Sequence, residues 1–324
     1  MSLFLCLFYF VIINLAVAGV GYRLMKAGNR WSSWLLMVLA ILPVCLLFFQ
    51  QPPIIKMLAI IATTFTGMKA VAVTAYYKDK KASLNFIQWL AFVIGWAGML
   101  PQPFEKFPAP SLTGGWPMIW FGVSRIIGGL AFVLLAHRLV LLPVNQRVPD
   151  VFISAILLVG LSLILHFGLL SVGAGMWRFS GVNTYYLFRK PANATSLTAF
   201  WSKRWNLAFS EMTSLTIFRP LRDTLGAPLA LMASFIFSGL LHELALSVPV
   251  NSGYGLPTLY FIIQGAMVLI EKKLIEQKSW VLSNKIFCKL WVFFWLIAPM
   301  PLLFHSQFIK QVVWPLAGLG HFNG

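Results

Sequence analysis

A histidine and a glutamate lie side by side inside a long apolar run of this sequence. The run reads "FIFSGLLHELALSVPV", residues 235–250, and it contains His242 and Glu243. Because removing an ionisable side chain from water is costly, such groups inside membrane segments are functional candidates. A neutral imidazole can also accept a proton near pH 7. His242 is therefore the first candidate for acid–base chemistry.

Two hydrolytic mechanisms do not fit this histidine. An intramembrane zinc protease needs a second histidine four residues later on the same helix face, where this chain has Leu246. A serine hydrolase would carry a Gly-x-Ser-x-Gly elbow, and none surrounds Ser238. We expect Ser238 to orient the imidazole or to bond its own backbone. Ser238 and Glu243 are therefore predicted to support the site, without a metal ion.

A polar and aromatic segment precedes the apolar run. Its densest part is "SLTAFWSKRWN", residues 196–206. Ser196 can cap a short helix on which Trp201 and Trp205, four residues apart, share one face. The basic side chains in and before this part include Arg189, Lys190, Lys203 and Arg204. A basic aromatic motif, then an apolar span, then a lone histidine inside that span is an order that favours one shared site.

Each of these polar residues also has a structural explanation. His242 could make a hydrogen bond between two helices, and Asn206 could be a polar residue at a helix interface. The cations could anchor a cytoplasmic loop to the membrane surface. The residues by themselves leave these alternatives open.

The composition places the chain in a membrane. Of its 324 residues, 59% are hydrophobic and 10% are charged, whereas an ordinary soluble domain is about 25% charged. The net charge of +17 favours membrane-flanking cations and an anionic ligand over nucleic acid as a partner. Three scattered cysteines, Cys6, Cys45 and Cys288, have no metal-ligand spacing.

The apolar runs predict an all-α integral membrane protein. A span needs about 20 apolar residues, and the candidate spans are 2–20, 31–49, 57–77, 84–100, 117–136, 151–170, 225–248, 256–270 and 286–304. We expect about 8–9 transmembrane helices, with short interfacial or re-entrant helices between them. Residues 1–324 are expected to form one multi-pass membrane domain: N-terminal helices at 1–150, a catalytic core at 151–285, and a C-terminal helix and tail at 286–324.

The charges of the loops give a topology that contains one conflict. The basic loops 21–30 and 78–81 are expected on the cytoplasmic side. Strict alternation from there places 178–222 outside, although this segment is basic and is expected in the cytoplasm. One crossing is therefore missing or extra, and 171–188 is a candidate for an irregular or re-entrant crossing.

The motifs together resemble a known family. "SLTAFWSKRWN", "FRPLR" and "FSGLLHELAL" are similar to elements of the membrane-bound O-acyltransferase (MBOAT) superfamily, and most of all to its wax-synthase-like branch. The resemblance is strongest over about 170–270. Ser202 and Lys203 stand where the family pattern often has Gly and Arg, and Leu241 stands where many members have Trp. The resemblance implies an MBOAT-like fold that encloses a tunnel.

The resemblance also implies a reaction, the transfer of an acyl group from acyl-coenzyme A to a hydroxyl. The family's catalytic pair matches His242, as general base, and Asn206, which would orient or polarise the thioester or the acceptor. Acyl-coenzyme A would be a co-substrate, with no permanently bound cofactor, and the acceptor a long-chain or otherwise apolar alcohol. The residues expected to bind the coenzyme are Arg189, Lys190, Lys203, Arg204, Trp201 and Trp205, the cations through its phosphates.

The catalytic pair is separated by 36 residues of sequence. The two side chains meet only if 207–224 turns back toward the bilayer. Pro220 is expected to make that turn by breaking a helix at or just before Phe218.

Two further functions stay open at this point. An enzyme of the same class could act as an O-acetyltransferase on a terpenoid, sterol or polyketide alcohol. A membrane transporter is the alternative from another class, because Lys69 and Arg125 fall inside apolar runs. These two cations could equally snorkel or pair with Glu243. Membrane lipids are expected partners, in the endoplasmic reticulum of a eukaryote or the inner membrane of a bacterium; the oligomeric state is not predicted.

Overall fold

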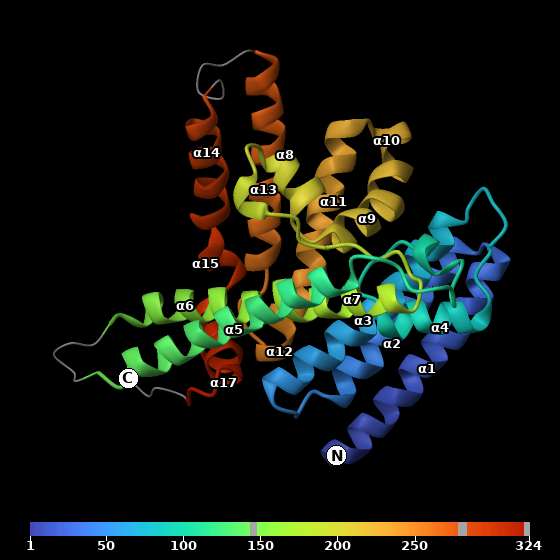
Figure 1. The fold of residues 1–324 in the computed structure, drawn as a ribbon, viewed down its shortest axis with the longest axis horizontal. Helices are drawn as coiled ribbons and strands as arrows, with labels where there is room; N and C mark the ends of the chain where they lie inside the picture. Colours follow the sequence, from blue (N-terminus) through green and yellow to red (C-terminus); the bar gives the residue numbers. More distant parts are fainter. Residues whose placement is uncertain (143–147, 278–283, 321–324) are drawn as a thin grey trace.

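The computed structural model describes residues 1–142, 148–277 and 284–320, and these residues form helices and connecting loops without a strand. Figure 1 shows the arrangement. The longer helices are α1 (Leu3–Ala27), α2 (Arg30–Leu47), α3 (Pro53–Tyr76), α5 (Gly115–Val140), α6 (Asp150–Ser162), α7 (Leu170–Phe179), α11 (Ala227–His242), α13 (Leu256–Glu276) and α14 (Lys285–Ile297). The predicted all-α class is confirmed.

Shorter helices and π-helical turns connect these elements. The short α-helices are α4 (Phe86–Gly95), α8 (Leu197–Ala199), α9 (Leu207–Thr213), α10 (Arg219–Leu225), α12 (Val248–Val250), α15 (Met300–Leu303), α16 (Ser306–Phe308) and α17 (Trp314–Leu316). The π-helical turns are Leu163–Leu169, Phe200–Arg204, Ser214–Phe218, Glu243–Ser247 and Ile309–Val313. Four of these turns fuse α6 to α7, α9 to α10, α11 to α12, and α16 to α17 into continuous helical segments.

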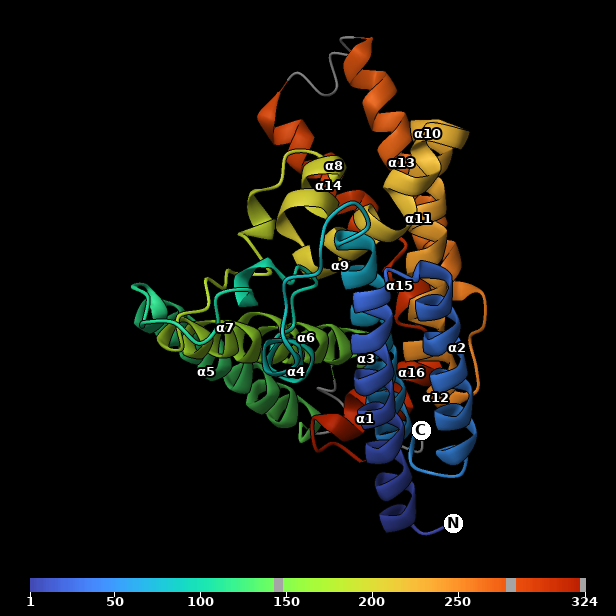
Figure 2. The same cartoon turned by 90° about the vertical axis from the view of Figure 1, so that its right-hand side faces the viewer.

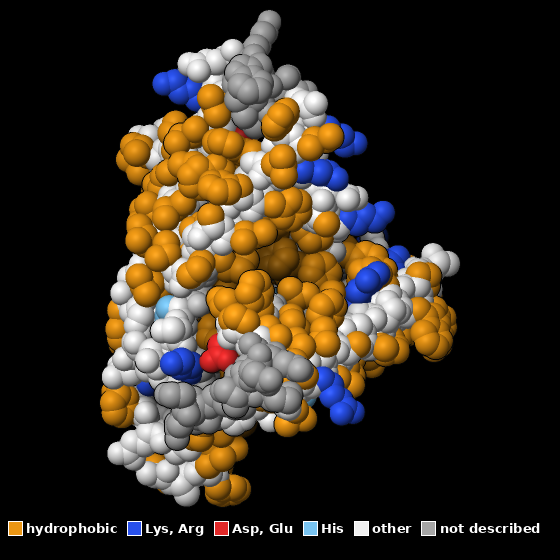
Figure 3. Space-filling model, turned by 90° about the vertical axis from the view of Figure 1, so that its left-hand side faces the viewer, with side chains coloured by type: hydrophobic (Ala, Val, Ile, Leu, Met, Phe, Trp, Pro, Cys, Tyr) orange, Lys and Arg blue, Asp and Glu red, His pale blue; other side chains and the backbone are white. Residues whose placement is uncertain are grey.

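The molecule is a multi-pass integral membrane protein. Seven helical segments of the described chain are long and apolar enough to cross a bilayer: Leu3–Ala27, Arg30–Leu47, Pro53–Tyr76, Gly115–Val140, Asp150–Phe179, Ala227–Val250 and Lys285–Leu303. Helix α13 packs beside α11 and is also of spanning length, although its last two turns carry Glu271, Lys272 and Lys273. The face in Figure 3 is broadly hydrophobic, with a hollow at its centre whose visible walls are hydrophobic.

One predicted span is wrong, and its loss removes the topological conflict. The run 84–100 forms only α4, ten residues from Phe86 to Gly95, which at 1.5 Å per residue extends about 15 Å, half of a bilayer core. The run is apolar because Trp89 and Phe92 are fully buried in protein. With α4 no longer a crossing, alternation from loop 21–30 places the region after α7 on the cytoplasmic side, in agreement with its basic character.

The predicted irregular crossing at 171–188 is also corrected. Residues 171–179 continue the span that begins at Asp150, through the π-helical turn Leu163–Leu169 into α7. The α6–α7 rod packs along α5. In Figures 1 and 2 these two long elements lie side by side and cross the direction of the other long helices. Glycines at 115, 122 and 129 permit this contact, because a Cβ on any of them would lie within 3.0 Å of a backbone oxygen of α6–α7.

The turn between the two motifs differs from the prediction. Pro220 does not break the helix: the chain stays helical from Leu207 to Leu225, and Pro220 follows a π-helical turn at Ser214–Phe218. The wider turn accommodates a residue that cannot donate a backbone hydrogen bond. The reversal occurs at Gly226 instead, whose φ of 80° favours glycine. The rod α9–α10 then returns as α11, and the two pack as an antiparallel hairpin.

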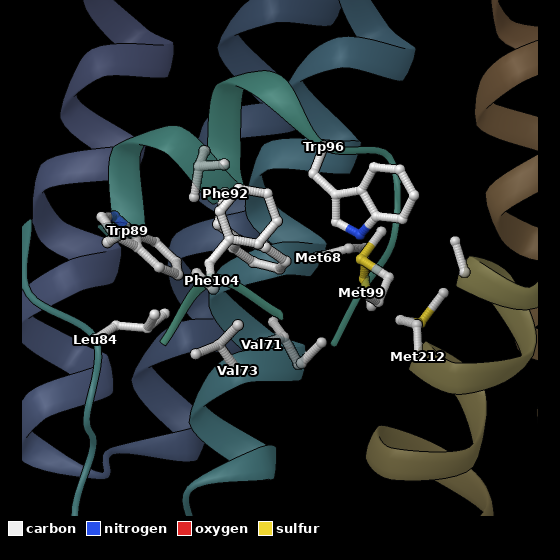
Figure 4. Packing of buried hydrophobic residues seen from close by; sticks show 14 of the residues in the cluster. Met68, Val71, Val73, Leu84, Trp89, Phe92, Trp96, Met99, Phe104 and Met212 are labelled. Carbon is white, nitrogen blue, oxygen red and sulfur yellow. The ribbon is translucent and has the colours of Figure 1, made fainter. Parts of the chain in front are cut away.

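The N-terminal helices form a core that reaches the hairpin. Figure 4 shows Trp89, Phe92 and Phe104 packed together among α1, α3 and α4, with Met99 directed toward Met212 of α9. Lys69 of α3 is fully buried here and donates hydrogen bonds to the carbonyls of Phe92 and Trp96. This cation therefore holds the C-terminal end of α4 and does not pair with Glu243. Arg125 lies over the ring of Phe121, 4.8 Å from its centroid.

Candidate active site

The hairpin fixes the orientation of His242. The imidazole lies at the end of α11, where the π-helical turn Glu243–Ser247 begins, and Nδ1 is 2.7 Å from the carbonyl oxygen of Ser238. A carbonyl oxygen only accepts, so Nδ1 carries the proton and, in the neutral ring, Nε2 has the lone pair. Nε2 has no hydrogen-bond partner among the described residues, and the side chain is only partly buried. His242 is thus arranged to accept a proton at Nε2.

Asn206, the second predicted catalytic residue, lies at the start of the other helical arm of the hairpin, just before α9. Asn206 is the N-cap of α9, with a φ of 44° that asparagine tolerates better than most residues. Its Oδ1 accepts the backbone N–H of Phe209 at 3.3 Å. The amide Nδ2 has no acceptor within the described parts of the chain. The cap therefore uses the oxygen of this side chain and leaves its two N–H donors for another group.

Backbone pairing holds Asn206 in place. The N–H of Leu207 donates to the carbonyl of Leu187 at 2.9 Å, and the N–H of Arg189 donates to the carbonyl of Arg204 at 2.8 Å. These bonds tie the end of the motif to an extended segment just before it. Non-helical backbone at membrane depth is tolerated when protein surrounds it. Phe188 and Leu187 are buried accordingly.

The two catalytic candidates come together through one aromatic ring. Phe209 follows Asn206 by three residues and receives its cap, and its ring centroid is 5.6 Å from that of His242. On the other side, Phe261 of α13 packs 4.4 Å from the imidazole. Asn206 lies 20 residues before Gly226 and His242 lies 16 residues after it, so the two are on facing arms of the α9–α11 hairpin. Phe209 thus connects the cap at Asn206 with the imidazole of His242.

A second histidine that the sequence analysis did not single out lies near this pair. The ring of His166, on the α6–α7 rod, is 6.0 Å from that of Trp205 and 5.1 Å from that of Phe188. His166 lies close enough to His242 for the two imidazoles to interact electrostatically. A signal existed in the sequence, because His166 lies inside an apolar run just as His242 does.

The two supporting residues act through their hydrogen bonds. Ser238 orients His242 with its main-chain carbonyl, while its hydroxyl donates to the carbonyl of Ser234 at 2.8 Å. Oε1 of Glu243 accepts from the backbone N–H groups of Gly255 and Thr258, each at 3.0 Å. Glu243 therefore caps the N-terminus of α13 and fixes the α11–α13 connection beside the histidine.

The predicted coenzyme-binding cations gather at one surface. Arg189, Lys190 and Lys203 are exposed. Arg204 lies among them, and its Nη1 is 3.3 Å from the carbonyls of both Arg189 and Lys190. Next to this cluster is an open hollow of about 420 Å³. It is lined by Tyr76, Leu100, Ser202, Ser210, Glu211, Ser214, Leu215 and Arg219.

The floor of this hollow has a carboxyl group in an unusual setting. Glu211 accepts the hydroxyl of Tyr185 at 2.6 Å through Oε1, and its Oε2 is buried. Burial raises the pKa of the Glu211 carboxyl, against the opposing effect of the Tyr185 hydrogen bond.

The two tryptophans of the motif face inward, away from these cations. Trp201 donates its indole N–H to Oε1 of Gln264 at 3.2 Å and packs 5.7 Å from Phe261. Trp205 packs against Phe188 at 4.9 Å. Their rings therefore connect the motif to α13 and to the His166 side of the site. No three His, Cys, Asp or Glu side chains of the described residues come together as a metal site.

Comparison with known proteins agrees with these motifs. Residues 185–263, which include Asn206 and His242, match the model of the membrane bound O-acyl transferase family. A "probable long-chain-alcohol O-fatty-acyltransferase" of Arabidopsis thaliana is 26% identical over 261 residues, covering 75% of this chain and 74% of the relative. A second from the same plant is 25% identical over 317 residues, covering 88% and 90%.

The chain is similar to the membrane-bound O-acyltransferase family, and most of all to its wax-synthase-like branch. These similarities indicate an enzyme that transfers acyl groups to hydroxyls. An "acyl-CoA–sterol O-acyltransferase" of Arabidopsis thaliana is also similar, 29% identical over 107 residues, covering 31% of each chain.

In this acyltransferase a buried carboxylate of α13 anchors the motif. Glu271 is 1% exposed and accepts the backbone N–H groups of Leu197 at 2.7 Å and Thr198 at 3.1 Å. Gln264, two turns earlier on the same helix face, holds Trp201. The sequence analysis missed both residues, since their partners lie more than 60 positions away and a Glu beside Lys272 reads as an ordinary surface charge.

We expect Glu271→Ala to destabilise the protein by about 1–3 kcal/mol, because two buried N–H groups would lose their acceptor. Thermal unfolding of the detergent-solubilised protein measures this as a lower midpoint. Glu276→Ala, at an exposed position on the same helix, is the matched control and should leave the midpoint unchanged. Equal midpoints for the two variants would show that the Glu271 bonds contribute nothing to stability.

Proposed function

We propose that this enzyme transfers a fatty acyl group from acyl-coenzyme A to a long-chain or otherwise apolar alcohol, with His242 as the general base. The observation that supports this proposal is that one of two side chains connected by Phe209 offers a hydrogen-bond acceptor and the other offers hydrogen-bond donors. His242 offers a lone pair at Nε2, and Asn206 offers N–H donors at Nδ2. Ester formation from a thioester needs one acceptor and one donor of this kind.

The reaction under this proposal proceeds without a covalent enzyme intermediate. Nε2 of His242 takes the proton of the alcohol as its oxygen attacks the thioester carbonyl. Nδ2 of Asn206 donates to the carbonyl oxygen while negative charge develops there. The carbon–sulfur bond then breaks, and the proton passes from His242 to the departing sulfur. The products are an ester and free coenzyme A.

The surroundings of the pair suit this chemistry. The rings of Phe209 and Phe261 border His242 and keep water from competing with the alcohol for the thioester. Arg189, Lys190 and Lys203 are exposed and suited to the phosphates of the coenzyme. We propose that acyl chain and alcohol reach the site between helices through a tunnel, with the apolar hollow in Figure 3 as one access route.

Release of free thiol tests the proposed function directly. Purified protein is incubated with palmitoyl-coenzyme A and a long-chain alcohol, and free thiol and ester are both measured. Equal amounts of thiol and ester, dependent on the alcohol, are expected. Solute flux in proteoliposomes without thiol release would instead support a transporter. Sole use of acetyl-coenzyme A would remove the wax-ester assignment in favour of an O-acetyltransferase.

A sterol is the second candidate acceptor, favoured by the similarity to the plant sterol acyltransferase. The same assay with a sterol in place of the long-chain alcohol separates the two. We expect the long-chain alcohol to give the larger kcat/KM, because the two relatives that cover most of the chain are named for that acceptor.

We expect Lys203→Ala to raise the KM for acyl-coenzyme A about three- to tenfold, with a smaller effect on kcat. One charge-assisted contact is lost, and phosphate contacts are made in both the ground state and the transition state. Higher ionic strength should raise the wild-type KM in the same direction. Lys272→Ala, exposed on α13, is the control. If both variants keep the wild-type KM, Lys203 does not bind the coenzyme.

A further inference from the structure

His166 and His242 share one local design although they lie on different spans. Each is associated with a π-helical turn, His166 within Leu163–Leu169 and His242 directly before Glu243–Ser247. Each has Nδ1 engaged by the residue four positions earlier: Ser162 Oγ at 3.1 Å for His166, and the Ser238 carbonyl for His242. π-helical turns inside helices occur frequently at functional sites.

The partners at Nδ1 give the two rings opposite properties at Nε2. A carbonyl makes Nδ1 of His242 the donor and leaves Nε2 bare. The Ser162 hydroxyl has no other hydrogen bond in the described chain, so it is free to donate to Nδ1 of His166. When Ser162 donates, the proton of a neutral His166 lies on Nε2, which becomes a donor. The site thus combines an acceptor on α11 with a donor on the α6–α7 rod.

The donor of His166 lacks a protein partner. Nε2 makes no hydrogen bond to any described residue, and the rings of Phe188 and Trp205 pack against the imidazole. A polar group in such surroundings is costly unless it is hydrogen-bonded. His166 also retains some exposed surface, so a ligand can reach it. A substrate oxygen at this position would satisfy the donor.

We propose that His166 binds the acceptor, donating a hydrogen bond from Nε2 to the hydroxyl oxygen of the alcohol. This assignment rests on the proposed function. The alcohol then makes two contacts, since its oxygen accepts from His166 while its O–H donates to Nε2 of His242. The remaining lone pair of the oxygen attacks the thioester carbon. His166 keeps its proton throughout, and the proton that reaches sulfur is the one carried by His242.

The alcohol is a better partner for His166 than the thioester is. The thioester carbonyl already has the donors of Asn206, on the same segment as the exposed cations. The α6–α7 rod brings His166 to the apolar rings of Phe188 and Trp205. An alcohol with one polar atom and a long apolar body needs one hydrogen-bonding group in an apolar wall. His166 is accordingly a determinant of acceptor binding.

Separate KM values for the alcohol and for acyl-coenzyme A test this assignment. His166→Leu removes the donor, and we expect the KM for the alcohol to rise about tenfold, as for loss of one buried hydrogen bond. The KM for acyl-coenzyme A should stay within about twofold. His166→Gln keeps an N–H donor and should recover most of the loss. Ser162→Ala, which frees Nδ1, should raise only the alcohol KM, by less than His166→Leu.

The control is another helical histidine whose Nδ1 is bonded to the residue four positions earlier. His137 on α5 lies with Nδ1 2.8 Å from the Val133 carbonyl, next to Gly318 and apart from the aromatic rings of the site. His137→Leu should keep all wild-type constants. If wild-type protein forms ester and His166→Leu keeps its alcohol KM, the His166 assignment is wrong while the proposed function stands. If the two KM values rise together and His166→Gln gives no recovery, His166 is structural. Absence of ester from wild-type protein would overturn both.

Discussion

Replacing His242 with alanine is expected to slow ester formation by about 10²–10⁴-fold, the usual loss when a general base is removed. The reason lies in the tautomer: the Ser238 carbonyl fixes the proton on Nδ1, so Nε2 is the atom that can take the alcohol proton. Binding of acyl-coenzyme A should persist, because the exposed cations are on another segment. The measurement is ester formed per mole of purified, folded enzyme.

The matched control for this variant is His137→Ala. Both histidines bond Nδ1 to the carbonyl four residues earlier, so a general cost of removing a helical imidazole would appear in both. A His242→Ala enzyme that keeps more than about a tenth of the wild-type rate would make His242 a structural residue. Loss of acyl-coenzyme A binding together with the rate would point to misfolding instead.

The spans and the motif pair could be predicted because their signals are local. A run of about 20 apolar residues almost suffices for a transmembrane helix, and the predicted span 225–248 lies within two residues of Ala227–Val250 at each end. The motif "FWSKRWN" is contiguous, and His242 is a single histidine inside an apolar run. Both can be recognised without knowing which residues they contact. Their order along the chain already favoured one site.

The error at 84–100 has a physical cause. Hydropathy measures whether a segment avoids water, and it does not distinguish burial in lipid from burial in protein. Trp89 and Phe92 are fully buried against neighbouring helices, so a ten-residue helix reads like a full span. The helix break predicted at Pro220 was wrong for a different reason. A π-helical turn accommodates a proline that would break a regular α-helix.

His166 and Glu271 show what sequence alone does not reveal. His166 lies 76 residues before His242, and close packing of glycine-bearing helices α5 and α6–α7 is part of what positions it. Glu271 becomes a buried anchor only because Leu197 and Thr198, more than 70 residues earlier, direct their N–H groups at it. Both roles depend on contacts between distant segments.

Asn206→Asp is the sharpest test of the second catalytic residue. Aspartate keeps an oxygen to cap α9 and tolerates the φ of 44°, but it has no N–H donor for the carbonyl oxygen of the thioester. We expect the rate to fall about 10²–10³-fold, as when an oxyanion donor is removed. Asn251→Asp is the control, since Asn251 also has a positive φ of 51° and lies outside the site.

Combining this change with His242→Ala asks whether the two residues act in one transition state. Independent losses would multiply, giving a double variant about 10⁴–10⁷-fold slower than wild type. Residues that act on the same reacting group lose their effects together. Without a base the alcohol does not develop its nucleophilic oxygen, and the charge that Asn206 stabilises on the carbonyl builds up less. We therefore expect the double variant to lie within about tenfold of His242→Ala alone, measured as single-turnover ester formation. Fully multiplicative losses would mean that Asn206 and His242 serve separate steps, even though Phe209 connects them within the α9–α11 hairpin.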